Sequence, residues 1–264
     1  MNLPTAEIVC LGNELLIGVT INTNASYIGE QLTKLGYEVR RITSIRDDVD
    51  LASVFFKELI LRKPNLLIIT GGLGPTYDDI QLEVISRVTG LELKENVEAL
   101  QQVKEYYAKR NLAVTKERRK MSFLPEGSKA LKNNVGGAPG CFFEYEGIQF
   151  YCLPGVPTEM KDIFKNNIEP KLLSNTKNVL YEKKFQIFNC LESELAPFIN
   201  EVKKEYMDLY IKSHPAYKDK KGIVIHISGI GEKGKEEIAN AMKKLQKIFL
   251  SNIPSVKIHQ IKER

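Results

Sequence analysis

The residues best suited to chemistry lie in the segment ITGGLGPTYDDIQ, which follows the apolar run NLLIIT. Gly71, Gly72 and Gly74 let the backbone turn sharply and approach a ligand with no Cβ in the way. The start of the helix expected next favours an anion such as a phosphate. Asp78 and Asp79 would repel that anion unless a cation lay between them, and Mg²⁺ commonly bridges one or two carboxylates and phosphate oxygens. A helix cap and a simple turn would explain only one aspartate and two glycines, so we predict a phosphate-binding loop with a metal at both aspartates.

A second polar cluster follows the first apolar run of the chain, AEIVCLG. Glu14 lies directly after this run, and Asn22 and Asn24 lie at the start of the next helix-like segment. In an open α/β sheet this loop shares an edge with the glycine-rich segment. Glu14 could hold a metal or a hydroxyl group, and Asn24 could donate an amide hydrogen bond. A polar loop with an ordinary helix cap accounts for the same residues equally well.

Two further turns carry glycines and polar groups: NNVGGAPGC, which contains Asn134, and LPGVPTEMKDIF, which contains Gly155 and Glu159. The second of them again follows a strand-like run and precedes a helix with Pro157 in its first turn. Each segment alone is only a turn signal. Three strand-to-helix turns with polar groups converge in this topology, however, and their convergence favours a single ligand site.

Other candidate motifs favour structure over chemistry. The segment GIGEKG, residues 229–234, matches a dinucleotide fingerprint in spacing, but no second strand ending in an acid follows it, so we predict a glycine-rich turn. The three histidines are far apart in the sequence, without metal-ligand spacing, and we interpret them as structural. The four cysteines form no CxxC pair and indicate buried, reduced thiols.

Strand-like and helix-like segments alternate through the first part of the chain, which predicts right-handed βαβ units and a mostly parallel sheet. The fold class predicted for this part is a three-layer αβα domain with one antiparallel hairpin. The expected strands are residues 6–12, 37–45, 65–70, 141–147 and 148–155, and the expected helices are 22–36, 47–63, 78–90, 96–110 and 157–173.

After about residue 173 the pattern changes to that of a second, smaller α+β domain, with the order βαββα(β). We therefore predict two domains, residues 1–172 and 173–264. Residues 171–264 hold 18 Lys and Arg against 11 Asp and Glu, a net +7, whereas residues 1–170 hold 20 against 22, a net −2. The basic helix of the small domain is interpreted as a solvated face, and no nucleic acid is expected as a partner.

Composition narrows the class of protein further. The 264 residues are 43% hydrophobic and 27% charged, which is typical of globular domains. The N-terminus has no signal-peptide pattern and no apolar run is long enough for a membrane span. We expect a cytoplasmic protein with no membrane partner.

The motifs GNELLIG, INTN, GGLGPTYDD, LKNNVGGAPG and LPGVPTEM, in this order, closely resemble the N-terminal region of the CinA (competence/damage-inducible) family, which has a MoaB/MogA-like molybdopterin-binding fold. The resemblance covers about residues 5–172 and, more weakly, the small domain. It implies a metal-dependent hydrolase that cleaves ADP-ribose to AMP and ribose 5-phosphate. The chain ends before the nicotinamide mononucleotide deamidase domain of longer relatives, so deamidase activity is not expected. Gln81 stands where the family commonly has threonine.

On this hypothesis the backbone N–H groups of the glycine loop hold the pyrophosphate, Thr76 adds a hydroxyl donor, and a divalent metal (Mg, Mn or Co) lowers the pKa of an attacking water. Glu14 or Glu159 serves as general base, and Asn24 and Asn134 contact sugar hydroxyls. Two other classes remain open: a molybdopterin-binding module without hydrolysis, and a non-catalytic interaction protein that docks through its basic small domain. The resemblance further implies a homodimer.

Overall fold

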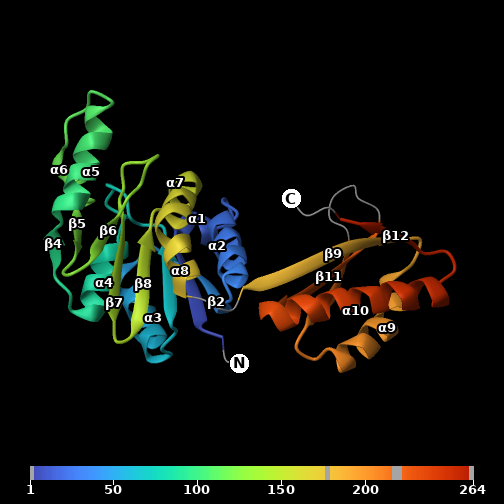
Figure 1. The fold of residues 1–264 in the computed structure, drawn as a ribbon. Helices are drawn as coiled ribbons and strands as arrows, with labels where there is room; N and C mark the ends of the chain where they lie inside the picture. Colours follow the sequence, from blue (N-terminus) through green and yellow to red (C-terminus); the bar gives the residue numbers. More distant parts are fainter. Residues whose placement is uncertain (1–2, 176–178, 216–221, 262–264) are drawn as a thin grey trace. The chain divides into compact units, whose positions relative to one another are not determined.

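The computed structural model describes residues 3–175, 179–215 and 222–261 of the chain (Figure 1). Contacts between residues divide the chain into two compact units, Met1–Thr176 and Lys177–Arg264. In the described residues, no helix combines the length and the apolar character that crossing a membrane requires.

The first unit is built on a six-stranded sheet with the order β2-β1-β3-β8-β7-β6. Strands β2, β1, β3 and β8 run parallel, while β7 pairs antiparallel with β8 and β6 pairs antiparallel with β7. All residues of β1 and β3 are buried, as expected for parallel strands that helices cover on both faces. The bounds are β1 Thr5–Leu11, β2 Glu38–Ile45, β3 Leu66–Thr70, β6 Lys129–Leu131, β7 Gly140–Tyr145 and β8 Ile148–Leu153.

Helices cover both faces of this sheet, and alternate strand residues point to one or the other. Val9, Leu67 and Ile69 pack in the core beneath α3 (Val49–Leu61) and α4 (Gln81–Thr89). Ile8 and Ile68 pack in the opposite core, beneath α2 (Thr23–Lys34), α7 (Pro157–Ile163) and α8 (Glu169–Asn175). The predicted three-layer αβα fold is confirmed.

Several short elements of the first unit were not predicted, because their sequences show no repeat of apolar residues. They are α1 (Asn13–Leu16), α6 (Lys116–Lys120), the paired strands β4 (Leu93–Glu95) and β5 (Phe123–Pro125), and the π-helical turn η1 (Phe164–Ile168) between α7 and α8. Strands of three residues and helices of four or five are too short for an apolar repeat. The longer α5 (Val97–Ala108) was expected, and the side chain of Asn96 caps it through the Ala99 amide.

The second unit is an antiparallel sheet with the order β10-β11-β9-β12 and two helices packed on one face. This is the predicted small α+β domain. Alternate residues of the central strands, such as Phe185, Ile187 and Ile225, form a core with Leu245 of α10. The bounds are β9 Leu180–Phe188, α9 Glu192–Glu205, β10 Tyr210–Pro215, β11 Ile223–Ile230, α10 Gly231–Asn252 and β12 Lys257–Gln260.

The segment GIGEKG differs from the turn that we predicted, because β11 continues to Ile230 and α10 begins at Gly231. Gly231 has a φ of 70° and changes the chain direction within one residue. A Cβ on Gly234 would lie 2.7 Å from the backbone carbon of Gly229, so these two glycines let the helix start pack directly on the strand.

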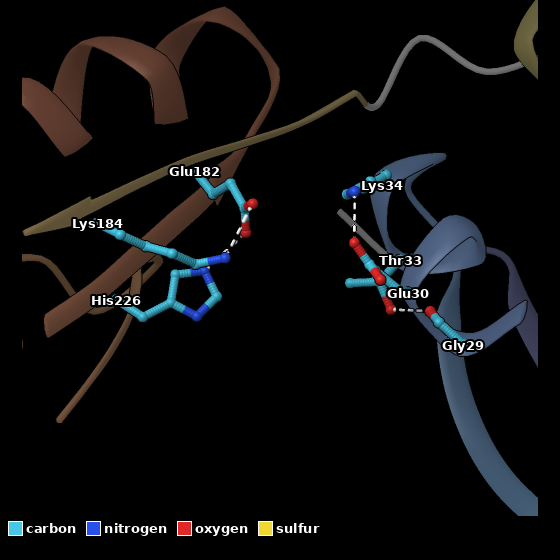
Figure 2. A network of polar contacts seen from close by, with 7 residues as sticks. All are labelled: Gly29, Glu30, Thr33, Lys34, Glu182, Lys184 and His226. Atoms are coloured by element: carbon cyan, nitrogen blue, oxygen red, sulfur yellow. Dashed lines mark hydrogen bonds and ion pairs between the residues drawn. The ribbon is translucent and has the colours of Figure 1, made fainter. Parts of the chain in front are cut away.

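The histidine of β11 is held by neighbouring charged side chains, as Figure 2 shows. His226 Nε2 lies 2.9 Å from Glu182 Oε2, and Lys184 Nζ donates to Glu182 Oε1 at 3.1 Å. Burial, with the Lys184 charge, lowers the pKa of His226 below its ordinary value of 6.5. This environment fits the structural interpretation of His226. In the first unit, Figure 2 shows Lys34 donating to Glu30 on α2.

Candidate functional site

A pocket of about 390 Å³ lies where several strands of the first sheet end. It includes residues that follow β1, β2, β3 and β8, which is the crevice outside the carboxyl ends of the strands where open α/β sheets bind ligands. The expected convergence of the polar turns is therefore present in the structure. The pocket is lined by these residues predicted from the sequence: Glu14, Gly71, Gly72, Gly74, Thr76, Asp78, Asp79, Gly155 and Glu159.

Glycine is required in the loop after β3 by its backbone conformation and by close packing. Gly71 and Gly72 have φ values of 96° and 68°, which side chains rarely permit. A Cβ on Gly71 would lie 2.0 Å from the carbonyl oxygen of Leu11. A Cβ on Gly155 would approach the Gly71 Cα to 3.2 Å. The loop thus brings bare backbone to the pocket.

The backbone donors of this loop are not equally available. The N–H of Gly71 already donates to the carbonyl oxygen of Leu153 at 3.2 Å, so it cannot serve a ligand as we expected. In the part of the chain that the structure describes, the N–H groups of Gly72 and Gly74 have no hydrogen-bond partner. Both residues line the pocket, so their amides are candidate donors for a ligand.

Gln81 fixes the loop from beneath. Its side chain is fully buried, and its Nε2 donates to the carbonyl oxygens of Gly71 and Leu153. Its backbone N–H donates to the Gly72 carbonyl oxygen at 3.0 Å. The residue that departs from the family pattern therefore anchors the loop, and it does so with its amide group.

The two aspartates are held by Thr76. The Thr76 amide donates to Asp79 Oδ2 at 2.7 Å, and its hydroxyl lies within hydrogen-bond distance of both aspartate carboxylates. These bonds close a turn over residues 76–79, so α4 begins at Gln81 and not at residue 78. The hydroxyl group that we expected to meet the ligand is occupied by the carboxylates. Lys120 clamps the same turn, because its Nζ donates to the Thr76 and Asp79 carbonyl oxygens at 2.9 and 2.8 Å.

Carboxylates gather on one side of the pocket. Asp47, which follows β2, lines the pocket beside Glu14, and its carboxylate accepts a hydrogen bond from the Asn13 amide at 2.8 Å. Burial raises the pKa of Asp47, and the negative charges of Glu14, Asp78 and Asp79 raise it further. Mutual repulsion of this kind favours a cation among the four groups.

These carboxylates do not form a complete metal cage. Among the described residues, no group of three or more His, Cys, Asp or Glu side chains is placed to hold a metal ion. Mg²⁺ characteristically uses only one or two carboxylates together with ligand phosphates and water. The donor set of Asp78 and Asp79 fits that kind of site.

Glu159 has a different environment from the other acids. Asn133 Nδ2 donates to Glu159 Oε2 at 2.7 Å, and the carboxylate rests on Gly136, where a Cβ would lie 2.0 Å from its Cδ. Burial raises the pKa of Glu159 above its ordinary value of 4.5, against the opposing effect of the Asn133 hydrogen bond. Glu159 is thus an oriented carboxyl group that holds a proton more readily than usual.

The two predicted asparagines do not line this pocket. Asn24 is buried beside it, where its Nδ2 donates to Thr70 Oγ1 at 3.1 Å and to the Gly155 carbonyl oxygen at 2.7 Å. Asn134 is exposed and its Nδ2 donates to Asp162 Oδ2 at 3.0 Å. Asn24 positions the loop at Gly155. Asn133, which we did not predict as a site residue, contacts the pocket carboxylate of Glu159 with its side chain.

The far wall of the pocket was missed in the sequence analysis. Tyr106 and Tyr107 of α5 line it, with the guanidinium of Arg110 3.6 Å from the Tyr106 ring centroid and that of Arg118 4.2 Å from the Tyr107 centroid. Nothing in the sequence marked these two tyrosines as site residues, because they lie on an ordinary amphipathic helix and belong to no motif. Asp47 had a usable signal, since it directly follows a strand expected to be parallel.

The fold and the pocket define a class: a three-layer αβα protein with a pocket at the carboxyl ends of its parallel strands. Comparison with known proteins gives the family. Residues 7–174 match the family model described as “Probable molybdopterin binding domain”, and the chain belongs to that family.

The relatives agree with this assignment. A protein of Saccharolobus islandicus is 44% identical over 260 residues, which cover 94% of this chain and 98% of the relative. A protein of Sulfurisphaera tokodaii is 44% identical over 249 residues, covering 92% and 94%. The crystal structure of the protein CinA, of unknown function, from Thermoplasma acidophilum is similar with a TM-score of 0.59 and 36% identity, covering 64% of this chain and 99% of that one. The resemblance to CinA is confirmed.

Proposed function

We propose that the protein binds a phosphorylated pterin of the molybdopterin type in the pocket of its first unit. The observation that carries this proposal is the glycine loop, which brings the uncommitted amides of Gly72 and Gly74 to a pocket of about 390 Å³. Backbone N–H groups that converge without side chains are suited to phosphate oxygens. Membership in the molybdopterin-binding family supports the pterin as the rest of the ligand.

A divalent cation belongs to the proposed complex. The pocket would otherwise place a phosphate beside the carboxylates of Glu14, Asp47, Asp78 and Asp79. Mg²⁺, Mn²⁺ or Co²⁺ held by Asp78 and Asp79 would neutralise the phosphate and join it to the loop.

Calorimetry under anaerobic conditions tests the proposal. Molybdopterin titrated with Mg²⁺ should bind at micromolar concentration, and the same pterin without its phosphate should bind at least tenfold more weakly, because charge-assisted hydrogen bonds and the cation contact are lost. Equal affinity for the two compounds, or no binding of either, would refute the proposal.

A second candidate is metal-dependent hydrolysis of a nucleotide diphosphate such as ADP-ribose, in which one water is added to give AMP and ribose 5-phosphate. The observation that favours it is Glu159, a carboxyl group held by Asn133 in the same pocket, with its pKa raised by burial. A carboxyl group tuned in this way is suited to take a proton from water at the phosphorus. Glu14 has no hydrogen-bond partner for its side chain among the described residues, so orientation favours Glu159 as the base.

Hydrolysis is tested by AMP release from ADP-ribose with Mg²⁺, Mn²⁺ and Co²⁺ in turn. Turnover with at least one metal, reduced at least 100-fold in Glu159→Gln and less in Glu14→Gln, is the result expected for this candidate. Absence of AMP with all three metals would leave ligand binding as the function of the pocket and eliminate the hydrolase.

A further inference from the structure

The sheet of the second unit has one face that the helices of this unit leave open. Phe185, Ile225 and Ile227 are buried on the other face, in the core that α9 and α10 complete. Figure 1 shows both helices on the same side of this sheet. Successive strand residues point to opposite faces, so the residues that alternate with this core lie on the open side. We call this side the open sheet face; it carries Lys184, Phe188, Tyr210, Lys212, His214 and His226.

All three histidines of the chain lie on the open sheet face, although they are far apart in the sequence. Lys212 of β10 pairs with His226 of β11, and His226 pairs in turn with Lys184 of β9. His214 of β10 and His259 of β12 lie at the two ends of the neighbouring row. The register of four strands therefore gathers side chains that no sequence motif connects.

Flat rings make up much of the open sheet face. The His226 ring centroid lies 5.5 Å from that of Tyr210 and 6.2 Å from that of His214. Phe188 and His259 form another ring pair, with centroids 5.0 Å apart. Tyr210 is 48% exposed, so its ring is accessible from outside the sheet. Accessible rings on a sheet face are suited to stacking on unpaired bases.

The charge of the open sheet face is positive. Lys212 and Lys257, on the outer strands β10 and β12, are exposed and have neither a hydrogen bond nor an ion pair in the described part of the chain. Glu182 is the acidic residue among the described strand positions of this face, and Lys184 and His226 already engage it (Figure 2). Residues 171–264 carry a net charge of +7. This charge complements a phosphate backbone.

We propose that the open sheet face binds single-stranded nucleic acid. The bases stack on the rings around His226, and the ammonium groups of Lys212 and Lys257 contact the phosphates. A duplex keeps its bases stacked on one another, so it offers the rings no free base.

The solvated face that an antiparallel sheet commonly exposes accounts for the lysines alone. It does not account for five rings, of which that of His226 contacts two others. The sequence alone predicts no nucleic-acid partner, because the register that gathers these residues is not visible in it.

Fluorescence anisotropy of the full chain with labelled oligonucleotides tests the inference. The probes are single strands of about 12 nucleotides, oligo-U and oligo-A RNA and oligo-dT, and a duplex of the same length. We expect micromolar binding of at least one single strand in about 50 mM NaCl, at least fivefold tighter than binding of the duplex, because stacking on the rings is lost in the duplex. With two phosphate contacts, the slope of log affinity against log salt should be about −1.4, roughly a sevenfold loss between 50 and 200 mM NaCl.

Two variants assign the binding to the open sheet face. Lys212→Gln should make the salt slope shallower by about 0.7, the share of one phosphate contact. Tyr210→Leu should weaken single-strand binding at least fivefold and leave the salt slope unchanged. Lys243→Gln is the matched control for the lysine, since Lys243 is exposed on α10, which packs on the covered face of the sheet. It should change neither quantity.

The inference is overturned if no single strand binds at about 100 μM protein in low salt, or if the duplex binds as tightly as the single strands. It is also overturned if Lys243→Gln changes the salt slope as much as Lys212→Gln does, because the basic helix would then hold the phosphates. Unchanged affinity in Tyr210→Leu would contradict stacking. Lys212 is exposed, so Lys212→Gln keeps the inference testable even if Tyr210→Leu fails to fold.

Discussion

Five acidic side chains line the pocket, those of Glu14, Asp47, Asp78, Asp79 and Glu159, and their hydrogen-bond partners differ. Asp78 and Asp79 are both hydrogen-bonded to Thr76 within one turn, which holds the two carboxylates close together. Asp47 has its pKa raised by burial and by its acidic neighbours. Glu159 stands apart, because its partner is Asn133.

Loss of the aspartate charges should abolish the dependence of binding on metal. Asn retains an oxygen that can accept from the Thr76 amide, so Asp78→Asn with Asp79→Asn preserves the turn while it removes both charges. We expect at least a tenfold loss of pyrophosphate affinity in the presence of Mg²⁺, measured by calorimetry. Asp50→Asn, at an exposed aspartate of α3 outside the pocket, serves as control. Unchanged Mg²⁺-dependent affinity in the double variant would contradict the cation site.

Glu159 should leave a signature in the pH dependence of stability. Burial raises its pKa above 4.5 in the folded protein, so the folded chain binds this proton more tightly than the unfolded chain. Its contribution to stability is therefore complete below pH 4.5 and is lost as the pH rises through the raised value. Urea unfolding between pH 4 and 7 should show wild type losing stability relative to Glu159→Gln as the pH rises. Parallel profiles would show that the pKa is not raised.

Elements meet at the loop after β3, where a backbone of glycines is packed against Leu11 of β1 and anchored by Gln81 of α4. The loop geometry thus depends on three elements of the first unit and not on local turn propensity alone. The buried Gln81 side chain also connects the loop to β8, because its Nε2 donates to the Leu153 carbonyl oxygen.

Gly71 and Gly72 should respond differently to alanine although both have positive φ. A Cβ on Gly71 would lie 2.0 Å from a backbone oxygen, whereas one on Gly72 would meet its nearest atom at 3.4 Å. We expect Gly71→Ala to lower the free energy of unfolding by more than about 3 kcal/mol, and Gly72→Ala by about 1 kcal/mol, the cost of the left-handed conformation alone. Denaturant unfolding of both variants provides the measurement. Similar losses for the two variants would refute the close approach to Leu11.

The elements also show how far sequence reasoning extends. The apolar runs of β1 and β3 and the polar turns after them were predictable, because parallel strands buried on both faces leave continuous apolar segments. The start of α4 was not, since Thr76 and Asp79 form a turn through side-chain bonds that no periodicity reveals. The short strands β4 and β5 left no repeating pattern from which they could be predicted.

Within the site, the prediction depended on what each residue does with its hydrogen bonds. The sequence analysis placed Gly71 and Thr76 in the right loop, but it could not show that the Gly71 amide serves Leu153 or that the Thr76 hydroxyl serves the aspartates. The side-chain amides of Asn24 and Asn134 donate to the Gly155 carbonyl oxygen and to the Asp162 carboxylate. Apart from the local bonds of Thr76, these assignments come from contacts between residues far apart in the chain.

At the scale of the whole molecule, the chain separates a mildly acidic unit with the pocket from a basic unit with its own core. All residues that line the pocket belong to Met1–Thr176. In the proposed function, backbone amides and a cation would therefore supply the affinity for a phosphate, because residues 1–170 carry a net charge of −2.

The first unit should bind the ligand without the second. The CinA structure from Thermoplasma acidophilum, whose chain corresponds to 64% of this one, indicates that a chain of this reduced length folds. We expect residues 1–176 to give a cooperative thermal transition and to bind pyrophosphate with Mg²⁺ within about threefold of the full chain, since no lining residue is lost. A folded fragment that has lost more than tenfold in affinity would show that the site is incomplete in the first unit.

The proposed binding site consists of the amides of Gly72 and Gly74, with a cation at Asp78 and Asp79, and holds the phosphate of a pterin-type ligand. A crystal structure of the protein with Mg²⁺ and a phosphorylated pterin tests it most directly. We expect phosphate oxygens within hydrogen-bond distance of both glycine amides and the cation between the phosphate and the two aspartates. A phosphate bound elsewhere on the molecule, with the glycine loop vacant, would contradict it.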